Sequence, residues 1–92
     1  MDTKTKEIAF LRGYVEFSSK AKKKYFKLPF NVRNLINVKL KDLQNEKRVD
    51  IKKLQGYKSC FRLRIGGYRI LLELRKNVWI VFDIDTREKV YG

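Results

Sequence analysis

The chain contains no histidine, a single cysteine and a single proline among its 92 residues. Without histidine, a His-based catalytic triad and the usual zinc sites are excluded, and one cysteine cannot form an internal disulfide. The longest apolar runs are four or five residues, which is too short for a membrane-spanning helix or a signal-peptide core. We therefore expect no cofactor, no metal and no membrane association, and a cytoplasmic location by default.

Acidic residues are also scarce, because 10 Asp and Glu stand against 23 Lys and Arg, a net charge of +13. Apolar residues make up 43% of the chain, which is ordinary for a globular protein and argues against disorder. A length of 92 residues leaves room for one domain with one core. A charge this large on so small a body favours a polyanionic partner, which is nucleic acid, an acidic protein or an anionic membrane surface.

Gly66-Gly67 lies between two alternating runs and suits a two-residue hairpin turn. One face of that hairpin is wholly apolar and is the predicted core. Its predicted cross-strand pairs are Ile65 with Tyr68, Leu63 with Ile70 and Phe61 with Leu72.

The opposite face of this hairpin carries Arg62, Arg64 and Arg69, with Arg64 directly across from Arg69. Like charges placed opposite each other destabilise a sheet by roughly 0.2–1 kcal/mol per pair. Such a cost without a structural gain indicates an anion-binding function. The simpler interpretation, which suffices for any one arginine, is the solvated face of a basic protein.

The other elements can be placed from apolar spacing and from turn residues. We expect a strand over 14–17, a helix capped by Ser18 or Ser19, a second helix from Pro29 to about Leu43, and strands over 68–75 and 78–85. The order β-α-α-β-β-β predicts an α+β domain, with an antiparallel sheet packed against an N-terminal helical hairpin. Residues 1–12 form an N-terminal extension and 13–92 the single domain.

The turn before the last strand can be chosen by matching core faces. A three-residue loop, Arg75-Lys76-Asn77, sets Ile70 opposite Phe82 and places Asp83 opposite Arg69. A two-residue loop would instead set Ile70 opposite Asp83, which breaks the apolar face. The sequence therefore predicts the three-residue loop.

This order of elements resembles the RelE/ParE superfamily of toxin–antitoxin modules and its microbial ribonuclease fold. The resemblance rests on Leu28-Pro29, on Lys53-Leu54-Gln55-Gly56, on the run Phe61–Ile70 with its Gly-Tyr-Arg, and on Arg87 with Val90-Tyr91. It covers Tyr14 to Tyr91. RelE-like members cleave mRNA in the ribosomal A site without a metal, by attack of the 2′-hydroxyl on its own phosphate. ParE-like members inhibit DNA gyrase and have no nuclease activity.

The resemblance also implies which residues act. The expected catalytic set is Arg62, Arg64, Arg69, Arg87 and Tyr91. Arg62 and Arg64 would clamp phosphate, since a pKa above about 12 makes arginine a poor base. Tyr91 would stack on a base or carry the proton, unless it only seals the end of the sheet.

Two further surfaces are expected. Ribosomal RNA would bind the lysines Lys20, Lys23, Lys24, Lys27 and Lys53. A cognate acidic, RelB-like antitoxin would form a hetero-oligomer through Tyr25, Phe26 and Phe30, of which Tyr25 best fits the core.

The leading hypothesis is thus a ribosome-dependent endoribonuclease toxin whose partners are the ribosome, mRNA and the antitoxin. The alternatives are a ParE-like gyrase inhibitor and an inert basic RNA-binding module. The combination of Arg69, Arg87 and Tyr91 favours the nuclease, because a pure binder needs no converging cationic site with a tyrosine.

Overall fold

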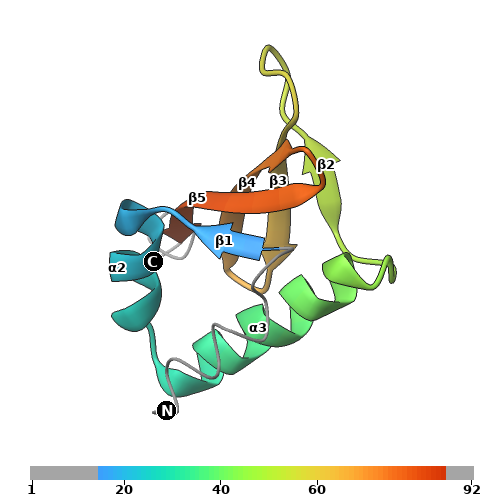
Figure 1. The fold of residues 1–92 in the computed structure, drawn as a ribbon. Helices are drawn as coiled ribbons and strands as arrows, with labels where there is room; N and C mark the ends of the chain where they lie inside the picture. The colour runs from blue at the N-terminus through green and yellow to red at the C-terminus, as the bar shows by residue number, and fades with distance from the viewer. Residues whose placement is uncertain (1–14, 87–92) are drawn as a thin grey trace.

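The computed structural model describes residues 15–86, which form a five-stranded sheet and two helices (Figure 1). In chain order the elements are β1 (Val15–Phe17), α2 (Ser19–Phe26), α3 (Phe30–Gln44), β2 (Ile51–Lys53), β3 (Cys60–Ile65), β4 (Tyr68–Arg75) and β5 (Val78–Thr86). The sheet order is β1-β5-β4-β3-β2. The predicted α+β class is confirmed. The expected extension over residues 1–12 lies outside the described residues.

The sheet differs from the prediction at both edges. Strand β1 runs parallel to β5, with Val15 opposite Trp79, so the sheet is mixed and not antiparallel throughout. At the other edge, β2 and β3 are separate antiparallel strands where one strand was expected. The chain leaves the extended conformation between them, with φ of 81° at Gly56 and 58° at Ser59. The amide of Leu54 closes this loop by donating to the carbonyl of Cys60 at 2.8 Å.

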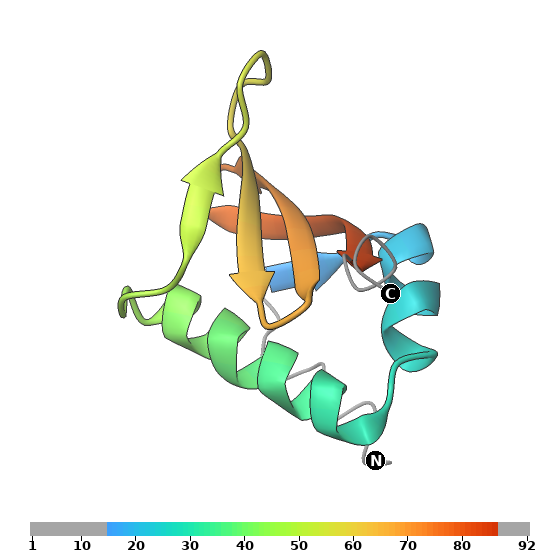
Figure 2. The same cartoon turned by 180° about the vertical axis from the view of Figure 1, so that it is seen from behind.

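The two helices do not lie along each other as the predicted antiparallel pair. They run at a steep angle and approach each other at their junction (Figures 1 and 2). Pro29 turns the chain there, with φ −57° and ψ 152°. Helix α2 packs against β5 and α3 packs against β3, so each helix covers its own part of the sheet. The Tyr25 hydroxyl donates to Asn37 Oδ1 at 2.7 Å and joins the helices.

Ser18 is the N-cap of α2, as expected, and it also fastens this helix to the sheet. Its Oγ accepts a hydrogen bond from the amide of Ala21 at 3.1 Å. The Ser18 amide donates to the carbonyl of Val81 at 2.9 Å, and its hydroxyl donates to the carbonyl of Phe82 at 3.3 Å. The start of α2 is therefore tied to the middle of β5.

The β3–β4 hairpin has the predicted register. Leu63 lies opposite Ile70, and Arg64 lies opposite Arg69. Leu63 and Ile70 are buried, and they pack with Ile36 of α3 in the core. The remaining core residues are Val15, Ala21, Tyr25, Leu40, Ile65, Leu72, Val81 and Ile84.

The predicted three-residue loop between β4 and β5 is wrong. The turn is Lys76-Asn77, with φ of 44° and 71°, and Arg75 lies opposite Val78. Two positive φ values are typical of a type I′ hairpin turn. A register shift between Leu71 and Leu72 then restores the apolar face.

That shift is a β-bulge in which Phe82 is the extra residue of β5. Leu72 lies opposite Val81, whereas Leu71 lies opposite Asp83. Ile84 therefore reaches the core beside Ile70, and Asp83 stays out of it. In residues 15–86, no helix is long and apolar enough to cross a bilayer.

Gly66→Ala is expected to lower the free energy of unfolding by about 1 kcal/mol, because an L-residue in the left-handed region costs roughly that much. Gly66 has φ of 57°, and a Cβ there would meet nothing within 4 Å, so backbone strain alone would act. Urea denaturation measures the change. Gly67→Ala is the matched control, since Gly67 is not among the glycines with positive φ. A Gly67→Ala cost as large as that of Gly66→Ala would contradict this account of the turn.

Candidate functional site

Three predicted site arginines lie together on the sheet face that points away from α3. Leu63 and Ile70 are buried in the core, and side chains alternate along a strand, so Arg62, Arg64 and Arg69 project from the opposite face. Arg64 is exposed and Arg62 is half-buried. The hairpin therefore brings Arg62 and Arg64 of β3 and Arg69 of β4 into one cationic cluster.

Arg69 is ion-paired, which changes the electrostatics expected for this cluster. Its Nη2 binds Asp85 Oδ2, and Asp85 lies directly opposite Arg69 on β5. The predicted neighbour of Arg69 was Asp83. The two-residue turn and the bulge each shift β5 by one residue, so Asp85 takes that position instead. The carboxylate of Asp85 offsets part of the Arg64–Arg69 repulsion, so this arginine pair carries less strain than the sequence suggested.

Asp83 forms ion pairs with two lysines of α2. Its carboxylate binds Lys24 Nζ at 2.7 Å and Lys20 Nζ at 3.3 Å, and it accepts from the Ile84 amide at 2.8 Å. Partial burial by itself would raise the pKa of Asp83. The hydrogen bond from Lys24, the amide of Ile84 and Lys20 together outweigh burial, and the pKa lies below the ordinary 3.8. Two of the predicted RNA-binding lysines are thus held at the margin of the arginine face.

The other predicted RNA-binding lysines are more scattered. Lys23 and Lys27 are exposed on α2. Lys53 lies opposite Phe61, on the α3 side of the sheet, and is not beside the arginines. Its neighbour Lys52 lies opposite Arg62 and extends the cationic face. The sequence missed Lys52 because a three-residue strand is too short for its facing to be read without its partner.

The predicted aromatic contacts divide between core and surface. Tyr25 is 1% exposed, so its ring belongs to the core and is not available to a partner. Phe30 is 66% exposed. Arg33 lies over both Phe30 and Phe26, with its Cζ at 5.8 and 5.9 Å from the ring centroids. The junction of the helices therefore offers one largely exposed aromatic side chain beside a cation.

A hollow of about 450 Å³ adjoins the arginine cluster on the same sheet face. It is lined by Leu54, Tyr57, Cys60, Leu71, Glu73 and Phe82. No local signal in the sequence predicts this hollow, because Phe82 lines it only as the extra residue of the bulge, and the loop over 54–59 supplies one wall.

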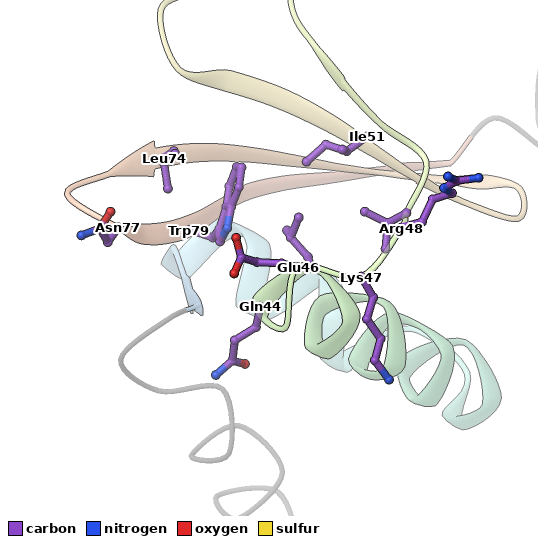
Figure 3. Close-up of a pocket in the computed structure, with 10 residues that line it drawn as sticks. Gln44, Glu46, Lys47, Arg48, Ile51, Leu74, Asn77 and Trp79 are labelled. Carbon is purple, nitrogen blue, oxygen red and sulfur yellow. The ribbon is translucent and has the colours of Figure 1, made fainter.

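A second cavity, of about 550 Å³, lies between the end of α3 and the β4–β5 turn (Figure 3). Its wall includes Trp79 and Leu74, which lie opposite each other, and its rim includes Lys47 and Arg48. The Trp79 ring packs edge-on against Phe61, on the α3 side of the sheet, with centroids 5.2 Å apart. This cavity is therefore separate from the arginine cluster.

Arg87 and Tyr91, the remaining members of the expected catalytic set, lie outside the described residues. Within residues 15–86, the candidate site thus consists of Arg62, Arg64 and Arg69, with Lys52 beside them and Asp85 paired to Arg69.

The sequence is similar to curated toxins. It is 30% identical over 69 residues to Toxin RelE3 of Methanocaldococcus jannaschii, covering 70% of this chain and 78% of that toxin. It is also 30% identical over 85 residues to the mRNA interferase toxin RelE of Escherichia coli K12, covering 86% of this chain and 90% of the relative. No family model matches the sequence.

The fold is also similar to solved structures. In the crystal structure of the RelB-RelE antitoxin-toxin complex from Methanococcus jannaschii, a chain matches with a TM-score of 0.69 and 28% identity. The match covers 82% of this chain and 93% of that one.

Asp83→Asn is expected to lower the free energy of unfolding by about 0.2–1 kcal/mol at neutral pH, which is the usual range for surface ion pairs. Because the folded-state pKa is depressed, the contribution is present above the unfolded pKa of about 3.9 and disappears as pH falls through the folded value. Denaturation at pH 7 and at about pH 3 should show the wild-type advantage shrinking. Asp50→Asn, at an exposed aspartate with no side-chain ion pair in residues 15–86, is the control. An advantage that is constant with pH would exclude the Asp83 carboxylate as its source.

Proposed function

The chain belongs to the RelE family of toxins, and we propose that it is the toxin of a type II toxin–antitoxin module. Its activity is that of an mRNA interferase, an endoribonuclease that inactivates messenger RNA. The observation that carries this function is the arginine cluster on the open face of β3 and β4, with Lys52 beside it. A gyrase inhibitor without nuclease activity is disfavoured by the relatives, of which the one from Escherichia coli is an mRNA interferase.

The charges around this face suit a phosphate backbone. Six cationic side chains surround it, namely Arg62, Arg64, Arg69, Lys20, Lys24 and Lys52, and the nearby carboxylates of Asp83 and Asp85 neutralise only part of their charge. Arginine binds phosphate through a planar fork of donors, which fixes orientation as well as position. The face can therefore hold an RNA strand with a chosen phosphate at Arg64 and Arg69.

We propose cleavage without a metal ion, by attack of the 2′-hydroxyl on the adjacent phosphorus. The O2′–P bond forms and the P–O5′ bond breaks, so the products are a 2′,3′-cyclic phosphate and a 5′-hydroxyl. The 2′-hydroxyl gives up its proton, and the leaving O5′ gains one. The transition state gathers negative charge on the phosphoryl oxygens, which Arg62, Arg64 and Arg69 would stabilise.

Arg87 and Tyr91, which lie outside the described residues, are the other two members of the proposed active site. Arg87 would add a cation to the phosphate site. Tyr91 would stack on the base next to the cleaved bond, close to the place where the proton moves.

We further propose that cleavage takes place in the ribosomal A site, in the cytoplasm, with α2 against ribosomal RNA. Lys23 and Lys27 are exposed on that helix, and Lys20 and Lys24 are held in place by Asp83. Lysines fixed in this way lose less conformational freedom when they bind phosphate. Lys53 points to the other side of the sheet, and Lys52 replaces it in this proposal.

Arg69→Ala is expected to reduce mRNA cleavage by about 10²–10³-fold, because it removes one donor to the developing phosphoryl charge. Mapping the 5′ ends of translated mRNA after induction measures the cuts, together with growth of the culture. Arg48→Ala, at an exposed arginine in the loop before β2, is the matched control and should cleave like wild type. Full cleavage by Arg69→Ala would remove Arg69 from the active site. Absence of cuts with the wild-type protein would defeat the nuclease function itself.

The net charge of this chain and its exposed apolar side chains indicate what kind of antitoxin it binds. A net charge of +13 would bind RNA indiscriminately unless it were masked, so an acidic partner that folds on binding is expected. Three apolar side chains of α3 are open to it: Phe30 at 66%, Val38 at 54% and Leu35 at 43% exposed. We propose that the antitoxin packs on this outer part of α3 and extends over the arginine face.

Phe30→Ala is expected to weaken the antitoxin complex at least tenfold, since a central aromatic anchor typically contributes 1.4 kcal/mol or more. Titration of the co-purified partner measures the affinity. The control is Asn31→Ala, an exposed polar neighbour on the same helix turn. The wild-type complex should survive about 1 M salt, where the Debye length is near 3 Å. Dissociation at that salt, or equal losses for the two variants, would mean that charge pairing alone holds the complex.

A further inference from the structure

The hollow beside the arginine cluster has the size and lining of a site for a flat aromatic ring. Its volume is about 450 Å³. Leu54, Leu71, Tyr57 and Phe82 provide apolar walls, and Glu73 is the one ionisable carboxylate among the lining residues. Small-molecule sites commonly combine apolar walls with a few polar groups that select the ligand.

The hollow continues directly from the phosphate-binding arginines. Leu71 lies opposite Arg62. Glu73 lies opposite Cys60, which is the next residue of β3 on the same face beyond Arg62. Two residues of a strand span about 6.6 Å. A nucleotide whose phosphate rests on Arg62 and Arg64 can therefore place its base over Leu71.

Two aromatic rings are available for that base. Tyr57 is 65% exposed in the loop before β3, at the mouth of the hollow. Phe82 enters the wall as the extra residue of the β5 bulge, and bulges near active sites commonly redirect a side chain in this way. Bases of every kind stack on such rings, because each base has a π-face.

Glu73 gives the hollow a preference among bases. Its Oε1 forms an ion pair with Arg75 Nε at 3.0 Å, which holds the carboxylate in place, and the side chain is 31% exposed. An ionised carboxylate only accepts hydrogen bonds. It therefore favours adenine, cytosine or guanine, whose exocyclic amino groups donate, over uracil, which presents carbonyl oxygens at the corresponding positions.

We propose that this hollow is a nucleobase subsite of the toxin, which binds the base next to the phosphate held by Arg62 and Arg64. Tyr57 and Phe82 stack on the base, and Glu73 selects bases that carry an exocyclic amino group. The inference rests on the proposed function, because it takes the ligand to be mRNA. The competing occupant, an apolar side chain of the antitoxin, would not require the carboxylate.

Cys60 provides a direct test, since it is the single cysteine of the chain and it lines the hollow. The rate of its alkylation by iodoacetamide is measured on the full chain with hexanucleotides of adenosine, cytidine or uridine. These probes carry the same backbone charge and differ only in the base. Adenosine and cytidine should protect Cys60 at about tenfold lower concentration than uridine.

Two variants distinguish the selection of the base by Glu73 from its stacking on Tyr57. Glu73→Gln should reduce the tenfold preference to about twofold, because an amide both donates and accepts. Tyr57→Ala should weaken protection by all three oligonucleotides about tenfold and keep the preference. Glu46→Gln, an exposed glutamate that lines the cavity on the α3 side, is the matched control and should behave like wild type.

Equal protection by the three oligonucleotides, or a preference unchanged in Glu73→Gln, overturns the subsite. Protection by the antitoxin alone would make the hollow a protein contact and overturn it as well. The mRNA-cleavage assay separates this inference from the proposed function. Cuts without base-selective protection defeat only the subsite, whereas base-selective protection without cuts defeats only the nuclease function.

Discussion

The β-bulge at Phe82 is the constraint on which the rest of this structure depends. A two-residue turn at Lys76-Asn77, continued without interruption, would place Asp83 opposite Ile70 in the core. A buried unpaired carboxylate costs several kcal/mol, and one extra residue in β5 avoids that cost. The shift places Ile84 in the core, and Ser18 fixes the start of α2 to the same part of β5. Core, helix placement and site geometry thus follow from one irregularity.

The same shift arranges charge on the open face of the sheet. Beyond the bulge, Asp83 faces the lysines of α2 and Asp85 faces Arg69. Asp83 holds two lysines that would otherwise repel each other, and Asp85 pairs with Arg69. The face stays net positive because its cations outnumber these two carboxylates. A phosphate that reaches this face meets donors already in position. Arg64 remains exposed and carries no ion pair to any residue in 15–86, so it is the most accessible member of the cluster.

In the proposed function, the two faces of the sheet also serve different ligands, the substrate and the antitoxin. The arginines and the hollow with Glu73 lie on the open face, whereas α3 covers the other and presents Phe30 and Val38 to solvent. An antitoxin anchored on α3 need not compete for the phosphate site in order to bind tightly. Inhibition would then come from the part of the antitoxin that continues over the open face, or from added bulk.

Local sequence alone determined the β3–β4 hairpin, the Ser18 cap and the clustering of Arg62, Arg64 and Arg69 on one face, because alternation and a glycine turn are local signals. The α+β class followed from the order of the elements. Only the tertiary structure decided the parallel pairing of β1, the angle between the helices and the facing of Lys52. Above all, it decided the bulge. A register shift relieves a conflict between two strands, so neither strand records it by itself.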